Sequence, residues 1–430
     1  MAQATIYGRS DIGYGVKASQ LGSGATGYKQ TGVMDGANAG SRIGFRGTED
    51  LGGGMKAHFV TEQGISPTNG AVFGVRTATA GAQYDGLATS TNTMDVGTAG
   101  GYSQGTNRQT YVGLEGGFGT IRVGYMYTTL YEISTLSGFT NTSEGAVGGS
   151  VAHLWGNGIS GGTRANGIRY ISPKLAGAWT VAVDMGSAGG RENTEWGAAN
   201  SANGRTLDKQ ARTGLHIDYN QGPLRAAIGI TQYSVDTSQA NANGVIPGAT
   251  PLNAAGTAIS NTNVSTFNVY GALTGVGGVA SVGNATFVTN LTQLAGSYDF
   301  GAIKLGATIN SGVKNVSAGT QAMSAAGAAI STAGTAATTT LAGNYNFASR
   351  AVSFDMPIGA MNLVGGFSNA SMDSNGTVLN DWASSQFGVK YNFSKRTLVY
   401  GYTGTSTDNM AAATGTKVIT GTLIGIDHSF

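Results

Sequence analysis

The chain has no cysteine, little proline and few charges. Its 430 residues include 0 Cys and 6 Pro, and Asp, Glu, Lys and Arg together make up 11%. The absence of cysteine excludes disulfides and thiolate chemistry but says little about the compartment. Soluble domains usually carry about twice this fraction of charged residues, so the composition is not that of an ordinary soluble enzyme. Hydrophobic residues at 40% still suffice to bury a surface, which argues against intrinsic disorder.

Long runs of one residue class are also missing. No stretch approaches the roughly 20 consecutive apolar residues that a spanning helix needs, so a helical membrane protein is excluded. The chain has no Lys/Arg run and a formal net charge of only +2, so nucleic acid is not an expected partner. Glycine is abundant, at 72 residues, but it shows no three-residue period, which excludes collagen.

Alternation of apolar and polar residues is what the chain does have, most clearly at its end. Within residues 417–430, Ile424, Ile426 and Phe430 fall at even positions. The odd positions of the same stretch are mostly small or polar and include Asp427. A period of two indicates a strand and not a helix. A terminal aromatic residue suits a strand that closes a membrane barrel, with the ring at the lipid interface and the carboxylate in water.

Sixteen segments share this period of two. They predict an all-β fold, a transmembrane antiparallel β-barrel of 16 strands, and an even number is usual for a barrel closed by one chain. The segments are residues 5–17, 41–49, 55–63, 108–115, 120–126, 167–172, 179–186, 212–220, 224–234, 293–300, 302–310, 348–356, 360–368, 384–392, 397–403 and 417–430. Residues 264–288 also alternate around Gly277-Gly278. If they crossed the membrane the barrel would have 18 strands, but we expect a hairpin within a long loop.

The connections between these segments alternate between short and long. The short ones carry turn residues, as in 50–54 (DLGGG). The long ones are 18–40, 64–107, 127–166, 187–211, 235–292, 311–347, 369–383 and 404–416, and of these 235–292 and 311–347 contain low-complexity sequence. Short periplasmic turns at one rim and long extracellular loops at the other are typical of outer-membrane barrels. We therefore expect residues 1–430 to form a single barrel domain.

Alternation also predicts which charged side chains face the inside of the barrel. Because Ile43 and Phe45 must face lipid, Arg42 faces the lumen. An inward arginine lines water, whereas one that faced lipid at mid-depth would cost on the order of 2–4 kcal/mol. The same argument in three segments gives the other predicted pore-lining residues, which are Arg9, Asp11, Arg46 and Arg122.

Four passages and the final residue carry a more specific pattern. They are 5–11 (TIYGRSD), 41–57 (SRIGFRGTEDLGGGMKA), 108–124 (RQTYVGLEGGFGTIRVG), 391–397 (YNFSKRT) and Phe430. Together they resemble the trimeric porins of Gram-negative outer membranes, and the match is good in the first third and at the end of the chain. The resemblance implies a homotrimer of water-filled channels for passive diffusion of small hydrophilic solutes and ions. It also implies closure of the barrel by the strand that ends in Phe430, and no cofactor.

The resemblance implies a constriction as well. In this family the third loop folds into the barrel, and its acidic side chains face arginines of the wall. Carried over by position, the loop is residues 127–166, the wall arginines are Arg42, Arg108 and Arg164, and the loop acids are Glu132 and Glu144. Opposite charges that face one another across a water-filled constriction select permeating ions by sign. Alternation supports Arg42 alone, because Arg108 and Arg164 lie at strand–loop junctions.

Two departures from the family pattern weaken the expectation of strong anion selectivity. Tyr125-Met126 stands where a basic Arg-Gln pair is common, and Asp427 stands where a basic residue often precedes the terminal aromatic residue. The inward arginines leave a weak anion preference as our expectation.

Functions of other classes fit the sequence less well. Only His216 and Asp218 lie close together on one face, and no nucleophile elbow or metal-ligand cluster accompanies them. We therefore expect neither an enzyme nor a metal site. A soluble repetitive β protein would need a fixed short repeat, and none recurs. The alternative that stays open is an outer-membrane barrel that acts mainly as a surface-display or adhesive structural protein through its long loops.

The expected location is the bacterial outer membrane, with lipid around the barrel. No signal peptide precedes Ala2-Gln3-Ala4. If the protein is exported, we expect the numbering to start at the mature end, with the signal peptide already removed.

Overall fold

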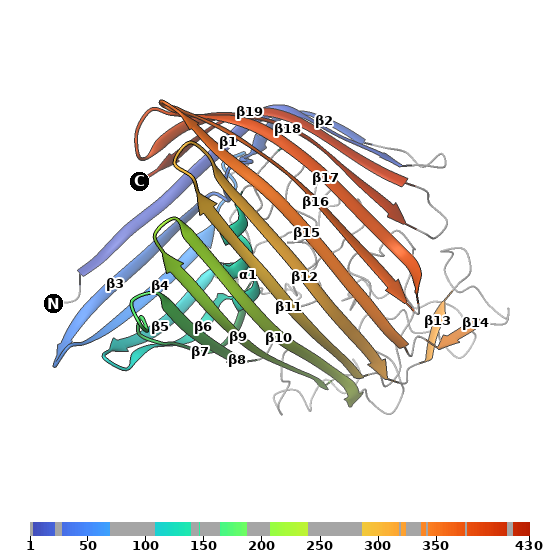
Figure 1. The fold of residues 1–430 in the computed structure, drawn as a ribbon, viewed down its shortest axis with the longest axis horizontal. Coiled ribbons are helices and arrows are strands. Elements are labelled where there is room, and N and C mark those ends of the chain that lie inside the picture. The colour runs from blue at the N-terminus through green and yellow to red at the C-terminus, as the bar shows by residue number, and fades with distance from the viewer. Residues whose placement is uncertain are drawn as a thin grey trace, which may run out of the picture.

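The fold is that of a barrel of long, tilted strands (Figure 1), seen in a computed structural model. The structure describes residues 3–21, 28–68, 108–138, 146, 164–186, 207–239, 286–317, 320–323, 337–340, 343–374, 376–410 and 416–430. Among these residues, no helix is both long and apolar enough to span a membrane.

Nineteen strands and two short helical elements make up the described part of the chain. In order they are β1 (Gln3–Leu21), β2 (Tyr28–Asp35), β3 (Arg42–Gly52), β4 (Met55–Gly64), β5 (Gln109–Gly116), β6 (Gly119–Tyr127), α1 (Thr129–Ser134), η1 (Thr135–Ser137), β7 (Arg164–Ile171), β8 (Trp179–Gly186), β9 (Leu207–Gln221), β10 (Leu224–Gln239), β11 (Thr286–Asp299), β12 (Lys304–Ser317), β13 (Thr320–Met323), β14 (Ala337–Thr340), β15 (Gly343–Ile358), β16 (Met361–Ser374), β17 (Thr377–Asn392), β18 (Thr397–Met410) and β19 (Thr416–Ser429).

Sixteen of the strands form a closed antiparallel ring, as predicted. The large sheet contains 17 strands, and β1 pairs with β19 to close it. The additional strand is β2, which pairs with residues 12–19 of β1, while β3 pairs with residues 3–9 of the same edge. β2 and β3 therefore share one position of the ring. β13 and β14 form a separate hairpin.

The alternative of 18 strands is wrong. β10 pairs directly with β11, in a continuous register from Leu224↔Tyr298 to Asp236↔Thr286. No further strand can stand between them, because this pairing is unbroken along both strands. Residues 264–285, the greater part of the hairpin that we expected there, lie outside the described residues.

Several connections that we predicted as long loops are largely strand. β1 continues to Leu21 and pairs with β2, so most of 18–40 is a hairpin. β16 and β17 likewise extend through 369–383 almost to their turn. The Ser, Thr and Asn residues of these stretches suggested loops. Their backbones nevertheless pair, because a hairpin can continue beyond the membrane once its register is set inside it.

The two faces of the wall differ as alternation predicts. Along β19, Ile424 and Ile426 point outward and are exposed, whereas Leu423 and Asp427 are buried on the inner side. Ile43 and Phe45 on β3 are exposed on the outside in the same way. An apolar outer face and a polar inner face are what a barrel in a bilayer requires.

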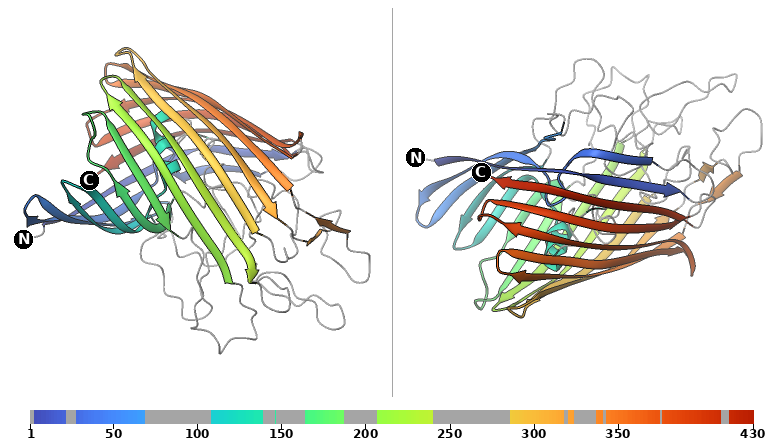
Figure 2. Two further views of the ribbon diagram at one scale, coloured as in Figure 1. Left: turned by 60° about the horizontal axis from the view of Figure 1, so that its bottom comes forward. Right: turned by 90° about the horizontal axis from the view of Figure 1, so that it is seen from above.

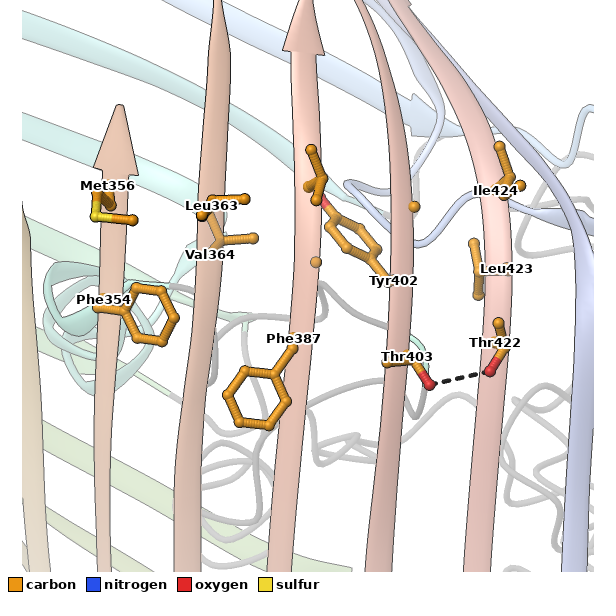
Figure 3. Close-up of a pocket in the computed structure, with 13 residues that line it drawn as sticks. Phe354, Met356, Leu363, Val364, Phe387, Tyr402, Thr403, Thr422, Leu423 and Ile424 are labelled. Atoms are coloured by element: carbon orange, nitrogen blue, oxygen red, sulfur yellow. Dashed lines mark hydrogen bonds between the residues drawn. The ribbon is translucent and has the colours of Figure 1, made fainter. Parts of the chain in front are cut away.

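One part of the outer face is hollowed. The outward positions Gly401, Thr403 and Thr422 are small, and they leave a depression of about 560 Å³ over β15–β19 that Phe354 and Phe387 border (Figure 3). The hydroxyls of Thr403 and Thr422 bond to each other, at 3.0 Å, which satisfies one of their two O–H donors in an apolar surrounding.

The closing seam places Phe430 opposite Gly8. Their backbones exchange two hydrogen bonds of 3.1 Å, one pair beyond the Arg9↔Ser429 register. The Phe430 ring fills the space that a side chain at Gly8 would need. A glycine covered by a cross-strand aromatic ring pins the register of the two strands.

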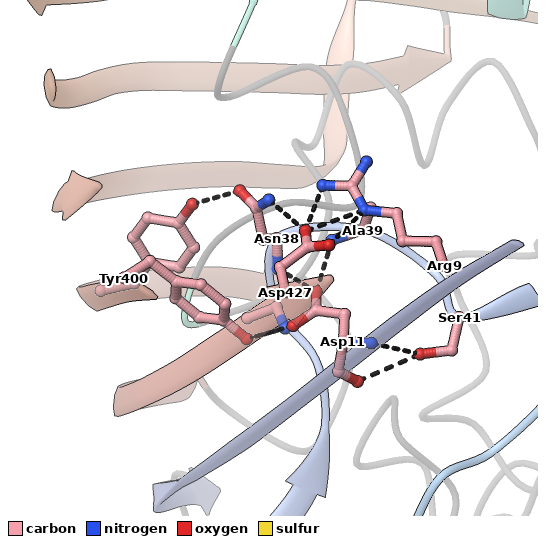
Figure 4. A network of polar contacts seen from close by, with 9 residues as sticks. Arg9, Asp11, Asn38, Ala39, Ser41, Tyr400 and Asp427 are labelled. Atoms are coloured by element: carbon pink, nitrogen blue, oxygen red, sulfur yellow. Dashed lines mark hydrogen bonds and ion pairs between the residues drawn. The ribbon is translucent and has the colours of Figure 1, made fainter. Parts of the chain in front are cut away.

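Residues 36–41 leave the wall between β2 and β3 and turn into the barrel; we call them the inturned segment. Asp11 holds it, because one carboxylate oxygen accepts the N–H groups of Asn38, at 2.8 Å, and Ala39, at 2.6 Å. The other oxygen accepts the Tyr400 hydroxyl at 2.6 Å. Figure 4 shows the network that results, with strands from both ends of the chain around it.

A second carboxylate completes this network. Asp427 receives Nδ2 of Asn38 at 2.5 Å and Nε of Arg9 at 2.7 Å. The Tyr402 hydroxyl donates to the Asn38 side-chain oxygen at 2.6 Å. Arg9 and Asp11 therefore lie on the inner side of the wall, and Asp11 is fully buried under the inturned segment and does not line open lumen.

We expect Tyr400→Phe to lower the free energy of unfolding by about 1–3 kcal/mol. The hydroxyl donates to Asp11 and also accepts the Ala37 N–H at 3.0 Å, so its loss leaves two buried groups short of a partner. Urea unfolding in detergent micelles would measure the change. The control is Tyr14→Phe, because Tyr14 is 62% exposed on the outer face. Equal unfolding midpoints for the two variants would contradict the assigned role of the network.

Candidate functional site

A short helical segment lies inside the barrel, directly after β6 (Figure 2). Thr128 caps α1 by accepting the Tyr131 N–H at 3.3 Å. Ile133 and Leu136 pack on the inner wall against Ala227 of β10 and Ala295 of β11. The described start of the predicted constriction loop is thus held inside the ring of strands by an apolar contact.

Two glycines of the wall make room for this segment. The space beside Gly229 is occupied by the tip of Ile133, and a side chain at Gly306 would overlap the carbonyl oxygen of Ser137. The Ser137 hydroxyl bonds to Thr308, and its carbonyl oxygen accepts the Ser353 hydroxyl. Further along, Ala146 lies against Gly421 of β19. The segment therefore touches the wall at several strands.

Ion pairs also tie the helix to the wall. Arg169 of β7 is completely buried, and it pairs with Glu132 at 2.8 Å and donates to the Tyr127 carbonyl at 3.1 Å. Next to it, Asp184 pairs with Arg212 at 2.8 Å and accepts the Thr129 hydroxyl. Desolvation inside the barrel raises the pKa of the Glu132 carboxyl, and the positive charge of Arg169 opposes that rise.

Arg42 and Arg108 meet at Glu62 of β4. The Arg42 guanidinium lies 3.6 Å from the Glu62 carboxylate, and Nε of Arg108 bonds to the same group. The Tyr7 hydroxyl also donates to it, at 3.1 Å. One carboxylate thus holds two guanidiniums at the loop end of adjacent strands.

Tyr127 joins Arg164 to this group. Its hydroxyl accepts Nη2 of Arg108 at 2.9 Å and Nη2 of Arg164 at 3.1 Å. The Arg164 guanidinium also lies over the Tyr127 ring, 4.5 Å from its centre, and the Tyr131 ring stacks on the same tyrosine with centres 4.4 Å apart. The structure thereby brings together the three residues of the arginine cluster, Arg42, Arg108 and Arg164.

The acids that we expected opposite this cluster are placed differently. Glu132 bonds to Arg169 on the wall and not to the arginine cluster. Glu144 lies outside the described residues. The acid at the cluster is Glu62, which comes from the wall itself.

Two of the three remaining predicted pore-lining arginines, Arg46 and Arg122, stack on tyrosines. The Arg46 guanidinium lies 5.2 Å from the centre of the Tyr7 ring, and that of Arg122 lies 5.0 Å from the centre of Tyr111. Arg9, in contrast, is held by Asp427 at the seam.

Sequence reasoning missed Glu62, Tyr127 and Arg169. A signal for Glu62 existed. Val60 lies opposite the inward Arg46, and Glu62, two residues further along β4, faces the same side of the sheet. Arg169 likewise alternates with the outward Ile168 and Tyr170. Tyr127 gave no such signal, because it ends its strand and enters the loop.

No candidate metal site is found in the part of the chain that the structure describes, since no three His, Asp or Glu side chains gather there in a suitable group. The buried carboxylates Asp11, Asp184 and Asp427 are all occupied by hydrogen bonds or arginines.

Comparison with known proteins gives consistent matches. A family profile described as Gram-negative porin matches residues 1–294. The major outer membrane protein P.IB of Neisseria meningitidis serogroup B is 30% identical over 199 residues, which cover 45% of this chain and 48% of that protein. The chain thus spans about half the length of the curated relatives it matches.

Solved structures match the fold over the whole chain. The anion-selective porin from Comamonas acidovorans aligns with a TM-score of 0.59 and 18% identity, covering 100% of both chains. The trimer form of OmpT from Vibrio cholerae aligns with a TM-score of 0.55 and 13% identity, covering 100% of this chain and 99% of that one. At these identities the likeness concerns the fold alone.

We expect Gly306→Ala to loosen the helical segment of residues 128–138, which we call the inner segment. The added methyl group would overlap the Ser137 carbonyl, so the bonds to Thr308 and Ser353 are strained or lost. Backbone amides of residues 129–137 should then exchange with solvent roughly tenfold faster, the factor for about 1.4 kcal/mol of local stability. Hydrogen exchange with mass spectrometry would measure this.

The matched control is Gly312→Ala on the same strand. Its neighbours are Leu291 and Asn290 of β11, so it adds the same methyl group away from the segment. If both variants exchange alike across residues 129–137, the contact at Gly306 does not hold the segment.

Proposed function

Because the chain belongs to the Gram-negative porin family and is a β-barrel of the bacterial outer membrane, we propose that it forms a water-filled channel for passive diffusion of small hydrophilic solutes and ions. The family assignment agrees with the expectation that the protein is not an enzyme. The single observation that carries the proposal is the arginine cluster, a set of charged groups on the inner side of a closed barrel. Charged side chains on the inner side of a barrel do not touch lipid. They act on ions that pass through the water inside it.

The inner segment supports a constriction. Residues 128–138 lie on the inner wall of β8–β12, and Tyr131 extends from them to the stack on Tyr127 beside the arginine cluster. A loop inside the lumen reduces the free cross-section, so solutes are sorted by size at this level and by charge at the arginines. Here the role proposed for Glu132 changes from an acid that faces the pore to one that anchors the loop at Arg169.

The charges at this level favour anions. The three guanidiniums of the arginine cluster are held by one carboxylate, Glu62, and one phenol, Tyr127. Counted over the described residues, the net charge of this group is positive, so it attracts anions and repels cations across a water-filled gap. The name of the porin from Comamonas acidovorans states anion selectivity for that protein, and we propose a weak anion preference for this one.

We also propose a homotrimer with one channel in each chain. The support is the likeness in fold to a solved trimer form, that of OmpT from Vibrio cholerae.

We expect Glu62→Gln to raise the ratio of anion to cation permeability by about two- to fivefold, since one unit charge at 4 Å in water contributes on the order of 1 kcal/mol. The substitution removes the negative charge that Arg42 and Arg108 share. The measurement is the reversal potential of single channels in a planar bilayer under a KCl gradient. The control is Asp355→Asn, an inward carboxylate of β15 that bonds to Asn362.

A cation-favouring potential in the unaltered protein would overturn the anion preference, and absent conductance would overturn the channel.

Native mass spectrometry in a mild detergent tests the assembly separately. We expect a mass of three chains, about three times 43.4 kDa. After heating in SDS the same sample should run as a single chain. A monomer as the only species before heating would sink the homotrimer while leaving the channel proposal in place.

A further inference from the structure

Most inward arginines of the described wall are bound to a carboxylate. Arg9 pairs with Asp427, and Arg42 and Arg108 share Glu62. Further along the wall, on β7, β9 and β10, Arg169, Arg212 and Arg225 pair with Glu132, Asp184 and Asp218, and Arg169 is opposite Arg122 in the register of β6 and β7. Arg46 and Arg122 differ, because neither forms an ion pair within the described residues. Each lies on a tyrosine ring instead. Neither of these two positive charges is therefore neutralised by contact with a carboxylate of the described wall.

Strand register places the two arginines on one stretch of the inner wall. Arg46 of β3 is opposite Val60 of β4, and Val60 is opposite Tyr111 of β5. Arg122 of β6 is opposite Gly113, two residues along β5 from Tyr111. Adjacent strands lie about 4.8 Å apart, so Arg46 and Tyr111 stand about 10 Å apart across Val60.

Tyr7 completes this stretch on β1, where it is opposite Gly44, two residues before Arg46. We define the inner patch by its residues, which are Tyr7, Arg46, Val60, Tyr111 and Arg122. The patch lies on the turn side of the arginine cluster, because β3 runs from Arg42 toward the turn at Gly52 (Figure 1).

The patch combines three kinds of contact in a small area. Arg46 is exposed and the other four residues are partly exposed, so a solute in the lumen can reach them. A guanidinium that lies on a tyrosine ring still has its second face and its two Nη groups available, and two parallel N–H bonds from the Nη groups match a carboxylate. Nε of Arg122 is buried, so only the Nη groups of this arginine face the lumen. Val60 offers an apolar floor between Arg46 and Tyr111.

Packing beside the patch, on the same inner face, keeps Tyr111 in place. The His58 ring meets Tyr111 edge to face, with centres 6.0 Å apart, and fills the space beside Gly113. On the other side the Tyr7 hydroxyl is bound to Glu62 at 3.1 Å, so this ring is also fixed. The two rings and the two guanidiniums are thus preorganised before a ligand arrives.

From this arrangement we propose that the inner patch is a binding subsite for planar aromatic carboxylates. The carboxylate takes the N–H edge of Arg46 or Arg122, and the ring lies over Val60 against the face of a guanidinium. A chloride or phosphate ion could use the charge but not the rings, so the aromatic contacts specify the ligand class. The inference rests on the proposed channel, because the ligand must enter the lumen, and it adds a solute class to it.

The test compares benzoate with cyclohexanecarboxylate, which has the same charge and a similar size but no flat ring. Ligand-observed NMR titration of the whole protein in detergent micelles gives the two dissociation constants without requiring a current. We expect benzoate to bind roughly two- to fivefold more tightly, the range of an exposed cation–π contact. In planar bilayers the same two anions are titrated against the KCl current, and benzoate should reduce it at the lower concentration.

The deciding variant is the double substitution Arg46→Lys with Arg122→Lys. It keeps both charges and removes both planar guanidiniums, so we expect the preference for benzoate to vanish while the KCl reversal potential stays unchanged. The matched control is Arg225→Lys, an inward arginine that is bound to Asp218 at 3.0 Å and should keep the preference. Heat-modifiable migration in SDS would verify that each variant is folded.

The outcomes separate the two proposals. Equal affinities for the two anions, or a benzoate preference that survives in the double variant, would overturn the subsite even if the channel conducts normally. A benzoate preference that the double variant abolishes, found in a protein without conductance, would support the subsite and overturn the channel. A benzoate preference that the double variant abolishes, found in a protein that also conducts, would support both the subsite and the channel.

Discussion

Every other feature of this structure depends on the need to satisfy the backbone inside a bilayer. Hydrocarbon offers no hydrogen bonds, so each N–H and C=O of a membrane-spanning strand must pair with a neighbouring strand. An open sheet would leave two edges unpaired. The seam between β1 and β19, which ends in the reciprocal bonds of Gly8 and Phe430, removes both edges at once. Closure then separates an outside from an inside, and alternation along each strand assigns every side chain to lipid or to the lumen.

This constraint explains how much of the fold could be predicted from the sequence. Alternation and the short turns sufficed for the sixteen strands and for the inward direction of Arg42, Arg46 and Arg122. They could not predict how far the strands extend on the side of the long loops. Beyond the membrane both faces of a hairpin meet water, so the apolar signal fades although pairing continues, as in β16 and β17. The inturned segment was equally hidden, because Asp11, Asp427 and Tyr400 come together only when the barrel closes.

The candidate site could be predicted only in part for a related reason. Position relative to the strands suggested the arginine cluster, and its members do meet. Which carboxylate each arginine would take was not predictable, since the choice depends on distances across several strands and on the path of the loop. Glu132 illustrates the point: its helix is pressed on the wall through Ile133 and Leu136, and that contact brings it to Arg169.

Carboxylate pairing divides the lumen arginines into two kinds, and this division links the architecture to the proposed transport. A buried arginine such as Arg169 or Arg212 must be paired, because an unpaired charge without water is strongly unfavourable. Such pairs hold the inner segment and the seam. An arginine that faces water needs no carboxylate, and a stacked tyrosine can fix its position while leaving its charge uncompensated. Arg46 and Arg122 are of this second kind. In the proposed channel, the buried pairs of Arg169 and Arg212 would fix the width of the passage, and the stacked Arg46 and Arg122 would act on passing anions together with the arginine cluster.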